Sequence, residues 1–160
     1  MGSDNTSIDR FNQAVDALRR EFPTLRVSVD MDGPNVEAFA HILPQAGMDF
    51  SVTFNLQNDE LHLNAGALWV EWFPCEEQEV FDAFIDALSG LIGGRYRIVE
   101  HYLGDEAVKA QLQGPIGSDG WKTIATWSNL GALIPWPRRR AVVQNGAGAP
   151  RAGGGSSGGA

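Results

Sequence analysis

The chain has 160 residues, of which 43% are hydrophobic and 20% are charged, a composition typical of one soluble globular domain. Its formal net charge of −8 at pH 7 argues against a general nucleic-acid-binding protein, because such a protein needs a basic face to displace counterions from phosphates. The chain has one cysteine, no secretory signal pattern and no apolar run of roughly 18 residues, so we expect a cytoplasmic protein.

The acidic and basic residues are unevenly distributed along the chain. Every Asp and Glu lies at or before Asp119, so residues 1–137 carry 8 basic and 20 acidic groups, a net charge of −12. We therefore expect the partner to be a basic protein or a small ligand, and neither a nucleic acid nor a membrane.

One globular domain is expected over residues 7–145. Residues 1–6 precede the first amphipathic pattern and are expected to be disordered. Residues 146–160, GAGAPRAGGGSSGGA, contain no large apolar residue, which is typical of a flexible Gly/Ser-rich tail. The hydrophobic core must therefore come from residues 7–145.

The first predicted element is an amphipathic helix over residues 7–22. Thr6, followed three residues later by Asp9, is a variant of the capping box, and Pro23 ends the pattern. The apolar residues at helical spacing are Ile8, Phe11, Val15, Leu18 and Phe22. A half-buried strand follows over residues 25–31, where apolar and polar residues alternate.

Residues 35–43, NVEAFAHIL, are compatible with either a helix or a strand. The residues that suit one helix face, and that also fit a strand, are Val36, Phe39 and Leu43. We expect a short helix that begins at Asn35 and ends before Pro44.

The centre of the chain predicts a hairpin, a strand and a second long helix. The hairpin occupies residues 50–63 with a polar turn at Asn58, and residues 67–73 form the next strand. A helix over residues 76–92 has a continuous apolar stripe and stops at Gly93.

The last third of the chain is expected to be mostly strands, although 107–113 also suits a short helix. The segments are 95–103, 107–113, 121–127 and part of 132–144, the last at a sheet edge because it contains prolines. Short turns between consecutive strands imply an antiparallel sheet. We therefore predict an α+β fold with one antiparallel sheet of about six to seven strands and two main helices packed against it.

Cys75 is the first candidate for chemistry, because a thiolate at a helix start is stabilised by the helix dipole. Here the neighbouring acids Glu76, Glu77 and Glu79 oppose a thiolate, and carboxylates in a first helical turn are well explained by the dipole itself. None of the three histidines lies in a recognisable cysteine-enzyme motif. We interpret Cys75 as a residue of the strand-to-helix junction.

Glu71 is the strongest candidate binding residue. In a strand, Trp69 and Glu71 point to one face and Trp72 to the other, so both faces carry large apolar groups, as in a central strand covered on both sides. A carboxylate there either pairs with an arginine such as Arg95 or Arg97, lies exposed beside a tryptophan, or binds a cationic or hydroxylated ligand in an aromatic-lined pocket.

Metal binding is weakly supported by the sequence. Glu60 and His62 share one face of a strand, but no HExxH, CxxC or other clustered ligand motif is present. We expect neither a metal site nor a cofactor.

A basic cluster follows Trp136. In a strand only Arg138 and Arg140 of the arginine run share a side, where they would bind an anion or an acidic partner. The alternative is that these charges protect an edge strand from aggregation.

Two functional hypotheses follow from these features. The first is a non-enzymatic protein-interaction module of the immunity or inhibitor type, favoured by the acidic body, five tryptophans and the absence of a catalytic motif. The second is a small-molecule-binding protein or an enzyme, with an aromatic pocket surrounded by Glu71, His62, Arg95 and Arg97. The positions of the five tryptophans should distinguish the two: a concavity favours a ligand, and a flat exposed patch favours a partner.

Overall fold

The computed structural model describes residues 3–31, 33 and 35–146. The tail predicted for residues 146–160 lies outside these described residues except for Gly146, and so do the first two residues of the predicted disordered start. The first helix begins at Ser3, so most of the segment assigned to a disordered start belongs to that helix.

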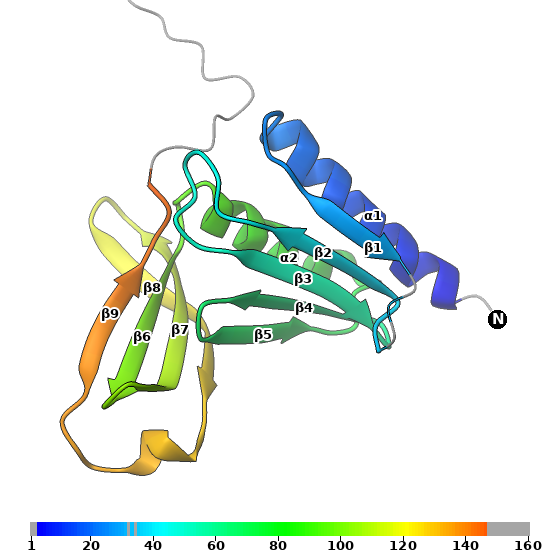
Figure 1. The fold of residues 1–160 in the computed structure, drawn as a ribbon. Helices are drawn as coiled ribbons and strands as arrows, with labels where there is room; N and C mark the ends of the chain where they lie inside the picture. Colours follow the sequence, from blue (N-terminus) through cyan, green and yellow to red (C-terminus); the bar gives the residue numbers. More distant parts are fainter. Residues whose placement is uncertain (1–2, 32, 34, 147–160) are drawn as a thin grey trace, which may run out of the picture.

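Five antiparallel strands form sheet 1, in the spatial order β1-β2-β3-β4-β5. Each strand therefore neighbours the strand next to it in sequence, as Figure 1 shows. The strands are β1 (Ser28–Met31), β2 (Ala38–Ile42), β3 (Val52–Gln57), β4 (Glu60–Ala65) and β5 (Leu68–Trp72).

Four further antiparallel strands form sheet 2, in the order β8-β7-β6-β9. These strands are β6 (Arg97–Leu103), β7 (Glu106–Ile116), β8 (Gly120–Ser128) and β9 (Arg139–Val143). The 3-10 helix η1 (Leu130–Leu133) lies in the connection from β8 to β9, at the far end of sheet 2 in Figure 1.

The two helices, α1 (Ser3–Glu21) and α2 (Gln78–Ile92), cover one face of sheet 1. The Phe54 ring of β3 lies between them, with its centroid 5.2 Å from Phe11 of α1 and 5.7 Å from Phe84 of α2. Strands β2 and β3 bury alternate residues, because only one face of this sheet packs against the helices.

Sheet 2 packs against the β5 end of this assembly, and its inner face belongs to the same core. Ile98 of β6 and Leu112 of β7 are fully buried in a cluster that also contains the core residues of sheet 1. The contacts between the sheets run from β5 to β7 and β8. One hydrophobic core therefore joins the two sheets.

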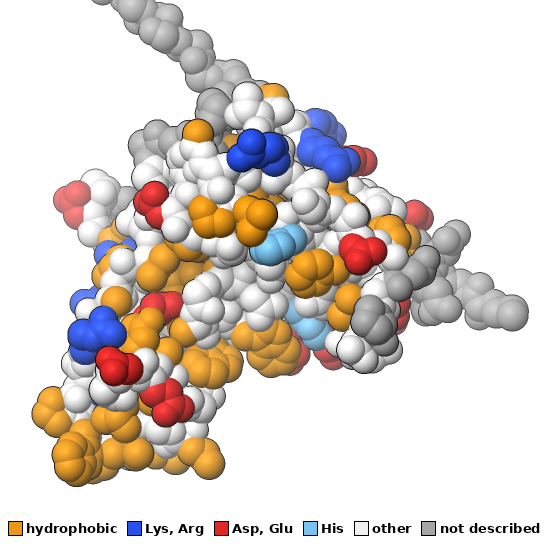
Figure 2. All heavy atoms as spheres, viewed as in Figure 1, with side chains coloured by type: hydrophobic (Ala, Val, Ile, Leu, Met, Phe, Trp, Pro, Cys, Tyr) orange, Lys and Arg blue, Asp and Glu red, His pale blue; other side chains and the backbone are white. Residues whose placement is uncertain are grey.

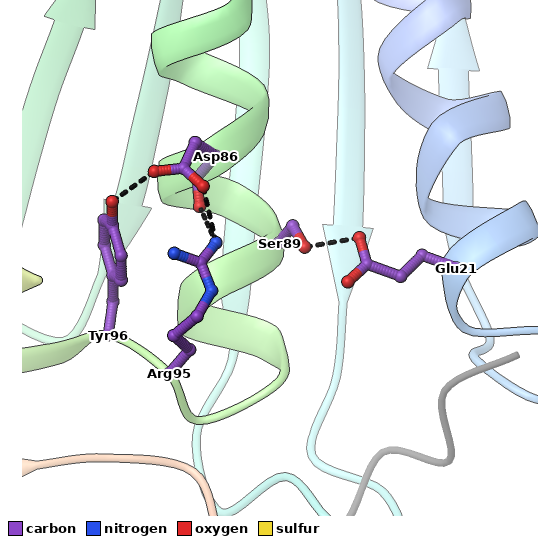
Figure 3. A network of polar contacts seen from close by, with 5 residues as sticks. All are labelled: Glu21, Asp86, Ser89, Arg95 and Tyr96. Carbon is purple, nitrogen blue, oxygen red and sulfur yellow. Dashed lines mark hydrogen bonds and ion pairs between the residues drawn. The ribbon is translucent and has the colours of Figure 1, made fainter. Parts of the chain in front are cut away.

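Polar contacts join α1 to α2, and join α2 to the segment just before β6, as Figure 3 shows. Asp86 of α2 accepts hydrogen bonds from Tyr96 and, at 2.6 Å, from Arg95. Burial would raise the pKa of Asp86, but these two hydrogen bonds and the charge of Arg95 together hold it below its ordinary value. Ser89 of α2 donates to Glu21 of α1 in the same view.

The predicted α+β class with an antiparallel architecture is confirmed. Nine strands are described rather than six to seven, and they are divided between two sheets. Both long helices are present, within a few residues of their predicted bounds. The hairpin turn is confirmed, with positive φ angles at Asn58 and Asp59 that suit a tight two-residue connection. Residues 107–113 form part of β7, and β9 is an edge strand, as the prolines in the segment before it indicate.

The short helix predicted near residues 35–43 is wrong, because this segment contains strand β2. Ala38, Ala40 and Ile42 are fully buried and point to the core face, while β1 and β3 bind the two edges of the strand. Helical and strand spacing coincide over so few residues, and the pairing partners on both sides decide the outcome.

Candidate functional site

The outer face of the β4–β5 hairpin brings together several of the predicted binding residues. The register places His62 of β4 directly opposite Glu71 of β5 and, on its other side, opposite Asn55 of β3. Trp69 lies on the same face, two residues before Glu71. Figure 2 shows histidine side chains in pale blue on this face of sheet 1, opposite to the helices.

His62 is at the centre of a short polar cluster. Its Nε2 atom lies 2.9 Å from Oε2 of Glu60 and 4.0 Å from Oε2 of Glu71. The His62 side chain is only 10% exposed, and the Trp69 ring meets it edge-on at 5.3 Å between centroids. The cluster therefore holds an imidazole nitrogen between two carboxylates.

Strand β5 lies at the edge of sheet 1, so the expectation of a central strand covered on both sides is wrong. The face of β5 that carries Trp69 is partly exposed to solvent. Trp69 is 42% exposed, and Phe73, which follows the strand, is 61% exposed. The Glu71 side chain is 53% exposed. Among the described residues its only ion-pair partner is His62, not an arginine.

The two arginines considered as partners of Glu71 have other contacts. Arg95 forms an ion pair with Asp86 at 2.6 Å and lies over the ring of Tyr96. The Arg97 guanidinium lies 4.1 Å from the centroid of the Trp121 ring and donates to Gln113. Neither arginine therefore belongs to the Glu71 cluster.

A groove of about 340 Å³ separates the facing edges of the two sheets. Its lining residues come from β5 and β8 and are Trp69, Val70, Glu71, Thr126, Trp127 and Ser128. Two tryptophans and one glutamate are therefore among the residues that line a common hollow, which is the kind of site that the small-ligand hypothesis requires.

The buried carboxylate of Glu100 fastens sheet 2 to the turn between β4 and β5. It accepts a hydrogen bond from the backbone N–H of Ala67 at 2.8 Å and another from the Tyr102 hydroxyl at 2.6 Å. The hydrogen bond to Glu100, with burial and the Glu100 charge, raises the pKa of Tyr102 against the opposing charge of Arg139. Glu100 thus positions the hairpin that carries His62.

Cys75 is fully buried at the start of the turn before α2. Burial is the largest influence that raises the pKa of its thiol, and the charges of Asp59 and Glu76 add to it. A hydrogen bond with Ser7 lowers the pKa of this thiol, but the net effect is a raised pKa. The geometry disfavours a thiolate, in keeping with the interpretation of Cys75 as a junction residue.

An apolar projection forms the connection between β8 and β9; we use this name for Leu130, Leu133, Ile134 and Trp136. The exposed fractions are 82% for Leu130, 79% for Leu133 and 69% for Trp136. Figure 2 shows hydrophobic side chains, in orange, gathered at this end of sheet 2.

Polar contacts hold the backbone of the apolar projection in place. The Asn129 side chain caps η1 by accepting a hydrogen bond from Gly131 N–H at 2.9 Å. Arg138 donates to the carbonyl groups of Ala132 and Ile134. Its guanidinium therefore closes the loop.

The sequence predicted that Arg138 and Arg140 share one side of a strand, but the structure shows a different arrangement. Strand β9 begins at Arg139, after Arg138 has turned to the loop carbonyls. The register places Arg140 opposite His101 of β6. Burial and the charge of Arg140 lower the pKa of Arg97. Arg139 lies over the Tyr102 ring at 4.3 Å from its centroid.

The tryptophans do not converge on one place. Trp69 and Trp127 line the groove, Trp136 is on the apolar projection, and Trp121 lies under Arg97. Trp72 is packed into the core, with its ring centroid 5.4 Å from that of Phe84. The groove and the apolar projection are therefore two separate candidates for the functional site.

Sequence reasoning missed several residues of these surfaces. Leu130 and Leu133 resemble ordinary core residues, and only the two prolines that follow them indicate a segment excluded from the sheet. Asn55 and Glu100 give no signal at all, because their positions beside His62 and Ala67 depend on strand register and on the packing of the two sheets.

No protein-family model, curated protein or solved structure matches this chain. None of the helices within the described residues is long and apolar enough to cross a membrane. The functional conclusion consequently depends on the surfaces themselves.

Proposed function

We propose that the chain is a non-enzymatic protein-interaction module that docks its partner through the apolar projection. The observation that supports this proposal is the exposure of Leu130 and Leu133, at 82% and 79%, beside the exposed indole of Trp136. Clustered large apolar side chains are unfavourable in water, and on soluble proteins they mark interaction sites.

The projection has the properties of an efficient docking element. The Asn129 cap and the Arg138 contacts order its backbone before any partner binds, which reduces the entropy lost on association. Tryptophan is also among the residues that contribute most to binding energy at protein interfaces. A partner with an apolar cleft therefore suits Trp136 and the two leucines.

The sequence range that contains the projection is basic, in contrast to the rest of the chain, and this guides the choice of partner. Residues 95–145 carry seven basic and four acidic groups, whereas residues 1–94 carry four basic and sixteen acidic groups. For the projection we accordingly propose a partner whose cleft has an acidic rim. The basic partner expected from the overall charge would instead suit the surface formed by residues 1–94.

Affinity purification from native lysate tests this proposal with a double variant, Leu133→Ser with Trp136→Ser, and with the control Leu43→Ser. Leu43 is also exposed, at 57%, but lies in the loop after β2. We expect wild type and control to retain one stoichiometric partner with an acidic surface, and the double variant to lose it. Equal retention by all three proteins would contradict docking through the projection, as would a soluble wild-type protein with no reproducible partner at any salt concentration.

A second candidate function is the binding of a small cationic or hydroxylated ligand, favoured by the groove that Trp69, Trp127 and Glu71 share. Glu71→Gln should abolish the thermal shift caused by such a ligand while leaving the melting temperature of the free protein unchanged.

A further inference from the structure

Three oxygen and nitrogen donors meet at the exposed end of the β4–β5 hairpin. Glu60, His62 and Glu71 each offer one ligand atom, and these atoms all lie within 4.8 Å of one another. We propose that they form a binding site for a divalent transition-metal ion of the Zn²⁺ type, with the amide oxygen of Asn55 as a fourth donor. This site is separate from the apolar projection and does not depend on the proposed function.

The separations between the donor atoms suit one small ion. Zn–N and Zn–O bonds of about 2.0–2.1 Å in a tetrahedral arrangement place neighbouring ligand atoms roughly 3.3 Å apart. The two separations from His62 Nε2, 2.9 Å to Glu60 and 4.0 Å to Glu71, lie on either side of this value. Because the Glu71 side chain is 53% exposed, a small rotation brings its oxygen closer without repacking the core.

The backbone holds these donors in a fixed arrangement. Glu60 and His62 are two residues apart on β4, so they point to the same face. His62 is directly opposite Glu71 on one neighbouring strand and Asn55 on the other, where cross-strand Cβ atoms lie about 4.5–5.5 Å apart. The site is therefore built on three hydrogen-bonded strands and needs no loop to close over it.

Asn55 supplies an independent indication of a missing ligand. Its Oδ1 atom is buried and has no hydrogen-bond partner among the described residues. A buried acceptor without a donor is unfavourable, and coordination of a cation satisfies it as a hydrogen bond does. The register places Asn55 directly opposite His62, so its side chain extends from the face that carries both carboxylates.

The donor set also selects the class of metal. An imidazole nitrogen favours Zn²⁺ and its transition-metal neighbours, whereas Mg²⁺ and Ca²⁺ prefer oxygen ligands alone. Two carboxylates balance the charge of a divalent ion. The edge-on Trp69 ring packs against His62 and limits its rotation, which keeps Nε2 directed between the carboxylates.

Zn²⁺ titration of the full chain, without an affinity tag and after removal of metal with a chelator, tests this site. Calorimetry gives the stoichiometry and affinity, and Co²⁺ absorption reports the coordination geometry. The variants are Glu71→Gln, which changes an exposed side chain and is expected to fold, and His62→Ala. The matched control is His41→Ala, because His41 lies in β2 on the same face, opposite Thr53.

We expect wild type and His41→Ala to bind one Zn²⁺ per chain with the same affinity. Glu71→Gln should weaken binding by about 10- to 100-fold, and His62→Ala by at least as much. Zn²⁺ should also raise the melting temperature of wild type more than that of either variant. The proposal is overturned by wild type that lacks saturable binding, by equal losses in His41→Ala and His62→Ala, or by Mg²⁺ that competes as well as Zn²⁺.

Discussion

Replacement of Glu100 by glutamine should loosen the joint between the two sheets. Glu100 is 4% exposed and accepts hydrogen bonds from Ala67 N–H and the Tyr102 hydroxyl, one on each carboxylate oxygen. Glutamine preserves the shape but has one acceptor oxygen, so its amide NH₂ group must face one of the two donors. Loss of one hydrogen bond to a carboxylate, with a donor left buried, is expected to lower the free energy of unfolding by about 2 kcal/mol. For a domain of this size that corresponds to a decrease in melting temperature of roughly 6–8 °C.

Urea denaturation and thermal melting at neutral pH measure this effect. Glu106→Gln is the matched control, since Glu106 is an exposed carboxylate at the start of neighbouring strand β7. We expect the control to change the free energy of unfolding by less than about 0.5 kcal/mol. If Glu100→Gln is no less stable than Glu106→Gln, the idea that Glu100 fastens the sheets fails.

Three further predictions concern Tyr96 and its hydrogen-bond partner Asp86. Gly90→Ala should lower the melting temperature, because the new Cβ would lie 2.7 Å from the Tyr96 ring. This clash should outweigh the helix propensity of alanine, which exceeds that of glycine by about 1 kcal/mol. A variant as stable as wild type, or more stable, would contradict this. The pKa of Asp86 in the folded protein is below its ordinary value of 3.8, so ionised Asp86 stabilises the fold above pH 3.8. This contribution is lost as the pH falls through the lower folded pKa. Asp86→Asn should therefore flatten the acid side of the plot of melting temperature against pH. Burial and the hydrogen bond to Asp86 raise the pKa of Tyr96 above its ordinary 10.0. Ultraviolet titration should therefore show the Tyr96 phenol ionising at higher pH in wild type than in Asp86→Asn. An unchanged titration curve would count against the contact between Tyr96 and Asp86.

Those parts of the fold that depend on local pattern were predictable from the sequence. The long helices have apolar stripes of three turns or more, and the hairpin at Asn58 has the alternation and turn residues that define it. The division into two sheets was not predictable, because it depends on which strand edges stay unpaired. Strand β5 is apolar on both faces for this reason: Val70 packs against the core, while Trp69 lies at the groove between the sheets.

The candidate sites show the same division between local and non-local information. The proximity of Glu60 to His62 follows from strand spacing and was predicted, but the addition of Glu71 and Asn55 requires the register of three strands. The prediction that an arginine pairs with Glu71 was wrong, because Arg95 pairs with Asp86 and Arg97 lies over the Trp121 ring. Charge pairing between distant residues is decided by packing, which the sequence does not display.

The proposed metal site and the apolar projection lie on opposite sides of the groove between the sheets. Glu71 belongs to the groove wall on β5, while Ser128 belongs to the opposite wall and directly precedes the Asn129 cap of η1. The two surfaces thus lie on different sheets, which Glu100 joins from the side of β6. Since no described contact joins Glu71 to the apolar side chains of the projection, Glu71→Gln should change metal binding without changing partner retention. Substitution of Leu133 and Trp136 should have the opposite pattern, so failure of either proposal leaves the other intact.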